Sequence, residues 1–98
     1  IFNRARRRIE ELQHMNRKQI LEKAEKMING PRAKAYGDAH ENHKRIAKMW
    51  SVILEKEVTV SQVYQCMIAV KLSRLIETPD HEDSWLDVCG YGALGGEK

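Results

Sequence analysis

The sequence contains little of what builds disulfide scaffolds, stiff loops or membrane spans. Two cysteines among 98 residues are too few for a disulfide framework, and both lie in apolar helical patterns where buried thiols are common. No apolar run approaches the roughly 20 residues that cross a bilayer, and no apolar export signal is seen, so we expect a cytoplasmic protein without a membrane span. With only two prolines and six glycines, the chain has few helix breakers.

Alternating strand patterns are also missing, whereas apolar residues recur at spacings of three and four. Apolar residues make up 42% and charged residues 32% of the sequence, a balance that suits one folded domain of this length. We therefore expect an all-α bundle of four to five helices in a single domain, residues 1–98. Residues 1–16 would form a basic N-terminal helix or extension, and residues 17–94 the core.

Capping signals mark where the helices begin. Asn16 with Gln19 forms a capping-box pattern inside the first helical segment, which leaves one long helix or two shorter ones open. A second helix is predicted from Asp38, with Glu41 closing the capping box, to about Leu54.

The third helix is predicted from Thr59, paired with Gln62 in a capping box, to about Glu77. Its nearly continuous apolar surface indicates the most buried helix. A fourth begins near Asp80 or His81. Gly90 and Gly92 could let another helix approach closely or could mark fraying, and Gly95 and Gly96 indicate fraying. The predicted core combines apolar residues from three helices: Trp50, Val63, Met67, Ile68, Leu72, Leu75, Trp85 and Val88.

The charge is distributed unevenly along the chain. Residues 1–49 carry 13 Lys or Arg against 6 Asp or Glu, a net charge of +7, whereas residues 50–98 carry 4 against 8, a net charge of −4. Four arginines near the start would attract the phosphates of a nucleic acid or an acidic partner: Arg4, Arg6, Arg7 and Arg8. The alternative is an ordinary solvated helix start.

Two charged clusters are candidates for a functional site. Asp83 and Asp87, spaced i and i+4, can share Mg²⁺ with water and substrate phosphates, or they can simply cap a helix turn and face solvent. Lys71 and Arg74 lie on an otherwise apolar helix, so they must pair with these carboxylates or bind a ligand phosphate.

A third cluster surrounds the start of the second helix. His40 and His43 have the spacing of half a metal site, but nothing else in the sequence completes it. Glu41 as a further Mg²⁺ ligand, and Asn42 as a hydrogen-bonding group for a base or sugar, are more economical assignments. Helix capping alone is the alternative for Asp38 and Glu41.

Together these segments resemble a small domain of unknown function that is widespread in bacteriophage and prophage genomes. The chain also looks like the phage nucleotide-modification-associated helical domain and, more distantly, is similar to MazG-like all-α nucleoside triphosphate pyrophosphatases and dimeric dUTPases. The resemblance covers residues 17–94 and rests on these strings: Tyr36-Gly37-Asp38, Asn42, Arg45-Ile46-Ala47, Trp50-Ser51, Val58-Thr59, Lys71-Leu72-Ser73-Arg74-Leu75, His81, Asp83-Ser84-Trp85, Asp87 and Gly90-Tyr91.

The resemblance implies an oligomeric, MazG-like bundle that binds a nucleoside triphosphate with Mg²⁺ or Mn²⁺ and cleaves its phosphoanhydride with water. It implies three catalytic and metal-binding carboxylates: Glu41, Asp83 and Asp87. It implies phosphate contacts from Lys71 and Arg74. It implies nucleotide contacts from four further residues: Tyr36, Asp38, Asn42 and Tyr91. The pyrophosphatase pattern has a second Glu where this sequence has Lys44, so binding without hydrolysis stays open.

We therefore expect a phage-encoded nucleotide-handling protein that acts as a homo-oligomer in the cytoplasm of the infected bacterium. The alternative belongs to another class: a noncatalytic interaction protein that binds a host or phage protein, or binds nucleic acid through its Arg-rich start.

Overall fold

The computed structural model describes residues 15–31, 33 and 38–98, and within these ranges the chain forms helices and no strand. The helices are α2 (Arg17–Asn29), α4 (Ala39–Leu54), α5 (Val60–Glu77) and α6 (Glu82–Gly96). The all-α class predicted from the sequence is therefore confirmed for this part of the chain. The Arg-rich start, with Arg4, Arg6, Arg7 and Arg8, lies outside the described residues.

Two helices begin with the capping boxes expected from the sequence. The Asn16 side chain accepts a hydrogen bond from the Gln19 backbone N–H, and the Gln19 side chain accepts one from the Asn16 N–H, both at 2.9 Å. Thr59 and Gln62 make the same reciprocal pair at the start of α5, at 3.1 and 2.9 Å. Each box satisfies two backbone donors that a helix start would otherwise leave unpaired. A helix therefore starts at Arg17, directly after Asn16.

The start of α4 differs from the prediction in one respect. Asp38 caps the helix by accepting a hydrogen bond from the His40 backbone N–H at 2.9 Å, as expected. Glu41 does not close a capping box; its carboxylate accepts a hydrogen bond from Lys44 Nζ at 3.0 Å instead. A cation three residues further along the helix offers that carboxylate an opposite charge, which a backbone N–H does not.

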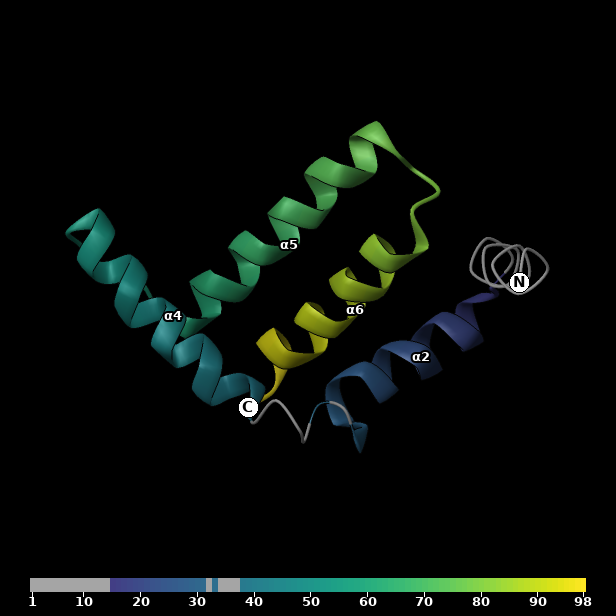
Figure 1. Ribbon diagram of the computed structural model, residues 1–98, viewed down its shortest axis with the longest axis horizontal. Helices are drawn as coiled ribbons and strands as arrows, with labels where there is room; N and C mark the ends of the chain where they lie inside the picture. The colour runs from purple at the N-terminus through teal and green to yellow at the C-terminus, as the bar shows by residue number, and fades with distance from the viewer. Residues whose placement is uncertain (1–14, 32, 34–37) are drawn as a thin grey trace, which may run out of the picture.

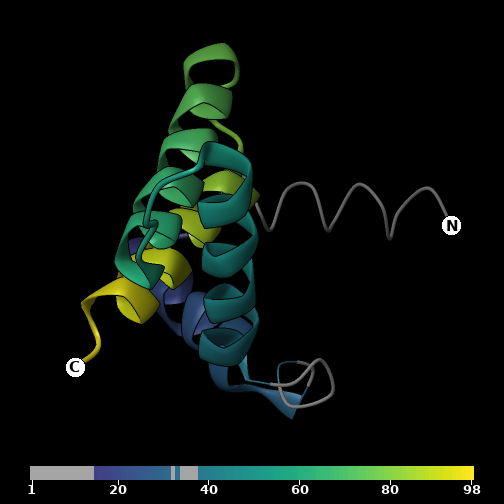
Figure 2. The same ribbon diagram turned by 90° about the vertical axis from the view of Figure 1, so that its left-hand side faces the viewer.

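The helices are arranged around α6 (Figure 1). α5 and α6 run antiparallel as a helical hairpin, α2 packs against α6, and α4 packs against α5. Figure 2 shows the same arrangement from the side of α4, which lies in front of the α5–α6 hairpin in that view. None of the helices in the described ranges has the length and apolar character needed to cross a membrane.

The core lies where these helices meet. Its buried apolar residues come from all four helices: Ala24, Ala47, Val63, Tyr64, Leu75 and Leu86. The predictions for Leu72 and Trp85 were wrong, because these side chains are 45% and 43% exposed. The expectation that α5 is the most buried helix was also wrong, because most of its residues are exposed whereas most residues of α6 are not. α5 packs against α4 and α6, and its remaining surface, including Ile76, is exposed to solvent.

Two glycines of α6 allow neighbouring helices to approach. A Cβ at Gly90 would lie 3.4 Å from Ile28 Cγ2 of α2, and one at Gly95 would lie 3.3 Å from Tyr64 Cβ of α5. Gly95 therefore lies in a helix–helix contact rather than in a frayed end, and α6 continues to Gly96. The prediction of fraying failed because a missing side chain can serve close packing as well as flexibility.

Candidate functional site

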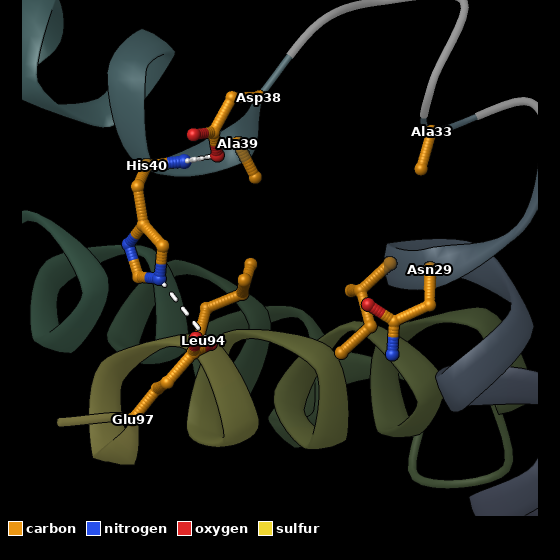
Figure 3. Close-up of a pocket in the computed structure, with 8 residues that line it drawn as sticks. Asn29, Ala33, Asp38, Ala39, His40, Leu94 and Glu97 are labelled. Atoms are coloured by element: carbon orange, nitrogen blue, oxygen red, sulfur yellow. Dashed lines mark hydrogen bonds and ion pairs between the residues drawn. The ribbon is translucent and has the colours of Figure 1, made fainter.

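A pocket opens between the end of α2, the start of α4 and the end of α6 (Figure 3). It has a volume of about 430 Å³, and its lining residues are Ile28, Asn29, Ala33, Asp38, Ala39, His40, Leu94 and Glu97. A second pocket of about 230 Å³ shares four of these residues and adds Met27, Asn42 and His43. The first volume lies within the range of about 300–1,000 Å³ that small-molecule sites occupy.

Two carboxylates are found among the described residues that line these pockets. Asp38 lines both pockets and Glu97 lines the larger one. Carboxylates suit ligand groups that donate hydrogen bonds, for example hydroxyl and amino groups. Arg32 and Lys34, which flank the lining residue Ala33 in the sequence, lie outside the described residues.

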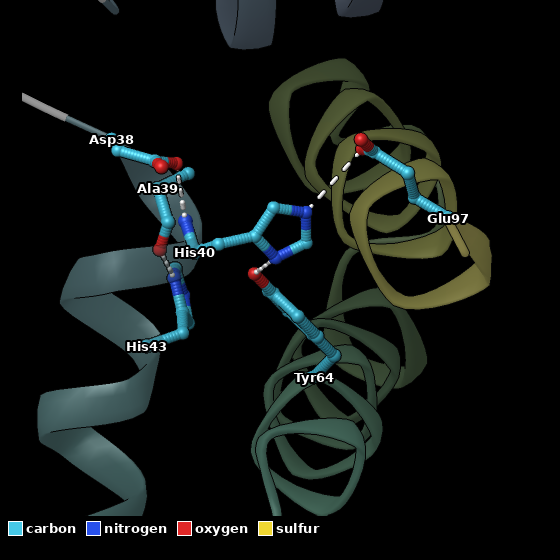
Figure 4. Close-up of polar contacts among 6 residues, drawn as sticks. All are labelled: Asp38, Ala39, His40, His43, Tyr64 and Glu97. Carbon is cyan, nitrogen blue, oxygen red and sulfur yellow. Dashed lines mark hydrogen bonds and ion pairs between the residues drawn. The ribbon is translucent and has the colours of Figure 1, made fainter.

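His40 connects three helices at the edge of the pocket (Figure 4). Its Nε2 lies 3.3 Å from Glu97 Oε2, and its Nδ1 lies 2.9 Å from the Tyr64 hydroxyl. A neutral imidazole satisfies both contacts when Nε2–H donates to the carboxylate and Nδ1 accepts from the phenol. The hydrogen-bond chain from Tyr64 to Glu97 thus fixes the orientation of the His40 ring.

His43 lies one helical turn beyond Ala39 and is buried. Its Nδ1 donates a hydrogen bond to the Ala39 carbonyl oxygen at 2.6 Å, since a carbonyl can only accept. Its ring packs at a centroid distance of 4.6 Å on Tyr64 and meets Tyr91 edge-on at 5.8 Å. In the neutral imidazole Nε2 is then a hydrogen-bond acceptor, on a side chain that lines the smaller pocket.

The environment of Tyr64 keeps its hydroxyl protonated. Burial raises the pKa of the Tyr64 phenol above its ordinary value of 10.0, and the negative charges of Asp38 and Glu97 and the nearby Tyr91 act in the same direction. Tyr64 is therefore a hydrogen-bond donor to His40 at neutral pH, and its environment opposes formation of a phenolate nucleophile.

This raised pKa predicts a loss of stability in alkaline solution. In the unfolded chain the Tyr64 phenol ionises near pH 10, whereas in the folded chain it holds its proton to higher pH. The stabilisation is complete below pH 10 and is lost as the pH rises from 10 through the folded-state pKa. Denaturation by urea between pH 8 and 11 should show a steeper loss of unfolding free energy for the natural chain than for Tyr64→Phe. Equal slopes would contradict the raised pKa.

The structure joins Lys71 and Asp87, which belong to two different predicted clusters. Lys71 Nζ lies 3.0 Å from Asp87 Oδ2, and the two side chains are 20% and 27% exposed. Asp87 precedes Gly96, the last residue of α6, by nine residues, which is about 14 Å along the helix axis, and Glu97 follows directly after it. The predicted phosphate contact Lys71 is therefore paired within the α5–α6 hairpin, at a distance from the pocket.

The predicted metal ligands are not brought together. Asp83 is exposed on α6, and Glu41 pairs with Lys44 on α4. Within residues 15–31, 33 and 38–98, no three His, Cys, Asp or Glu side chains gather closely enough to hold a metal ion. Arg74 is exposed. The described residues thus do not form the three-carboxylate Mg²⁺ site that the resemblance implies.

The predicted nucleotide contacts fall into three groups. Asp38 and Asn42 line the pockets. Tyr91 is half-buried in the aromatic contacts around His43 and is not among the lining residues. Tyr36 lies outside the described residues. The structure therefore brings together two of the four residues at one cavity.

Two further residues of the site were missed in the sequence. Tyr64 was not among the predicted site residues, although a buried tyrosine usually needs a partner for its hydroxyl, and that rule could have suggested a link to a histidine. Glu97 carries no local signal, because its contact with His40 spans 57 positions of the chain.

Comparison with known proteins places the chain in a family. The sequence profile of a domain of unknown function, DUF6378, matches residues 19–98. The chain is 43% identical over 76 residues to the Gene 55 protein of Mycobacterium phage L5 and 44% identical over 72 residues to the Gene 55 protein of Mycobacterium phage D29. These matches cover 76% and 74% of this chain but 49% and 48% of the relatives, so the chain spans about half their length. No solved structure matches it.

Proposed function

The chain belongs to the DUF6378 family of domains of unknown function, and from that premise we propose that it is the nucleotide-binding part of a phage nucleotide-handling protein. The observation that carries the proposal is the pocket between α2, α4 and α6, with its carboxylates and imidazoles. The similarity to bacteriophage proteins supports a phage setting for this activity.

The lining of the pockets suits the base and the sugar of a nucleotide. Sugar hydroxyls donate to carboxylates such as Asp38 and Glu97, and the Asn42 amide both donates to and accepts from the edge of a base. His43 Nε2 adds an acceptor in the smaller pocket. The apolar lining residue Ile28 offers a surface on which a planar base can pack.

Lys71 and Arg74 remain the proposed phosphate contacts, as a second site in the α5–α6 hairpin, because neither residue lines the pockets. A phosphate bound there would compete with Asp87 for Lys71. The proposed Mg²⁺ or Mn²⁺ ion is bound jointly by Asp83, Asp87 and the phosphates of the ligand. Because the described residues gather no third carboxylate there, binding is better supported than MazG-like hydrolysis.

The test is a binding panel read by calorimetry, with nucleosides and with nucleoside mono-, di- and triphosphates, each with and without Mg²⁺. Asp38→Asn is the informative variant, because asparagine still caps a helix while removing the charge. We expect it to weaken binding at least about tenfold, since a hydrogen bond to a charged group contributes about 1.5–3 kcal/mol. Asp80→Asn makes the same charge change at an exposed residue outside both pockets and should leave the affinity unchanged.

Two results would overturn the proposal. One is the absence of binding by every nucleoside and nucleotide, and the other is an equal effect of Asp38→Asn and Asp80→Asn. Mass spectrometry of the same mixtures reports any turnover, which the double variant Asp83→Asn/Asp87→Asn should abolish if these carboxylates share the ion.

A second candidate function is the noncatalytic interaction protein that binds a host or phage protein. It is favoured by the large apolar side chains exposed at the end of α4, where Val52 is 78% and Ile53 71% exposed. Large apolar patches exposed on soluble proteins often mark protein–protein interaction sites. Nucleic-acid binding through Arg4, Arg6, Arg7 and Arg8 stays a prediction on residues outside the described ranges.

A further inference from the structure

The exposed surface of α5 is unlike the exposed surfaces of its neighbours. From Ser61 to Ser73, its exposed side chains are all uncharged: Ser61, Gln62, Gln65, Cys66, Ala69, Val70, Leu72 and Ser73. The exposed side of α4 carries Glu41, Lys44, Arg45 and Lys48 over a similar length. In a chain with 32% charged residues, a solvent-facing helix surface is normally charged, and an uncharged one is typical of a helix covered by another.

We propose that this uncharged face of α5 binds the same face of a second copy of the chain, antiparallel about a two-fold axis near Ala69. The α5 face is defined here by Gln62, Cys66, Ala69, Ser73 and Ile76. On an α-helix these positions follow spacings of three and four, so they form one stripe. Two-fold symmetry then sets each residue opposite a counterpart, with Ala69 facing itself.

The α5 face of one copy is complementary in size and in charge to the same face of the second copy. Ala69 at the centre lets two helix backbones approach closely, and Ile76 at one end lies opposite Gln62 of the second copy in this register. A partner with charged groups along the stripe would bury them unpaired, at a large cost in free energy. A second copy presents no charge there.

The area required also favours a symmetric pair. A stable interface buries about 800 Å² on each partner, more than one helix stripe offers. The end of α4, which is joined to α5 by a short loop (Figure 1), offers further apolar surface for the interface, since Met49, Val52 and Ile53 are each more than 60% exposed. The proposed pair requires this end of α4 to contact the second copy as well. In a symmetric pair, each copy contributes the same apolar surface, so one contact removes both surfaces from water.

This dimer proposal is independent of the nucleotide proposal, because Asp38, His40 and Glu97 lie outside the α5 face.

The test of the dimer is the mass of the full chain in solution, measured by sedimentation equilibrium over a range of concentrations. We expect twice the chain mass for the natural sequence. Ala69→Glu would place two like charges at the axis and should raise the dissociation constant at least about 100-fold. Ala93→Glu, the same change at an exposed position of α6, should not.

A cross-link checks the register. In a Cys66→Ser background, Ala69→Cys places two thiols at the proposed axis, where the Cα atoms come within disulfide range. Mild oxidation should then yield a covalent dimer, and Ala93→Cys in the same background should yield none. Circular dichroism confirms that each variant keeps its helices. A monomer at every concentration, a dimer insensitive to Ala69→Glu, or cross-linking only at position 93 would overturn the proposal and leave the face to a different protein.

Discussion

Replacing Tyr64 with alanine is expected to lower the free energy of unfolding by about 3–5 kcal/mol, the range for removing a large buried aromatic side chain. The Tyr64 residue is only 2% exposed, and its ring packs on His43 at a centroid distance of 4.6 Å. It also lies against Gly95, at the point where α5 and α6 approach closely. A domain with 5–15 kcal/mol of stability would lose a large share of it.

The control is Tyr64→Phe, which keeps the ring and removes the hydroxyl that bonds to His40. We expect it to cost about 1 kcal/mol, the net contribution of one hydrogen bond. Urea denaturation followed by circular dichroism measures both variants. If the two substitutions were equally costly, the ring would contribute little, and the packing described for α4, α5 and α6 would be incorrect.

The Tyr64→Phe variant also separates stability from ligand binding. If His40 is oriented by the Tyr64 hydroxyl, loss of that bond should weaken binding in the pocket while the chain stays folded. An unchanged affinity would show that Glu97 alone positions the His40 ring.

A second large effect is expected for Leu86→Ala, with a loss of about 2–5 kcal/mol in unfolding free energy. Leu86 is completely buried on α6, the helix that contacts both α2 and α5. Removing its side chain leaves a cavity that the surrounding helices can fill only in part.

Leu21→Ala is the matched control, because it is the same substitution at a residue 63% exposed on α2. It should change the unfolding free energy by no more than about 0.5 kcal/mol, as for most surface substitutions. Thermal unfolding of both variants measures the difference. A cost at Leu21 equal to that at Leu86 would mean that the Leu21 side chain is buried, which would contradict the packing of α2 described above.

The helices themselves followed from short stretches of sequence. The capping boxes at Asn16 and Thr59 were predicted and are present, because a capping box depends only on residues three positions apart. The Asp38 cap was predicted for the same reason, and only the role of Glu41 was wrong. The ion pair between Lys71 and Asp87 was one of two predicted alternatives, since an apolar helix leaves few partners for a cation.

The burial of individual residues was less predictable. Leu72, Ile76 and Trp85 have the apolar character of core residues but are exposed, because no described helix covers those faces of α5 and α6. A helical pattern shows which residues share a face. It does not show whether another helix lies against that face.

Some residues of the candidate site were predicted from the sequence, and others were found only in the structure. Asp38 was predicted as a ligand contact from the resemblance, and Asn42 from its place in the cluster at the start of the second helix; both line the pockets. The roles of Tyr64 and Glu97 came only from the structure, since their bonds to His40 span 24 and 57 positions.

The sequence by itself determined the helical class, the helix starts and the separation of basic and acidic halves, because each depends on neighbouring residues or on composition. The tertiary structure alone decided that the end of α6 meets the starts of α4 and α5, which creates the pocket and orients His40. It also decided that the uncharged side of α5 faces outward. Both outcomes depend on how whole helices pack, and packing is set by the fit of surfaces that lie far apart in the chain.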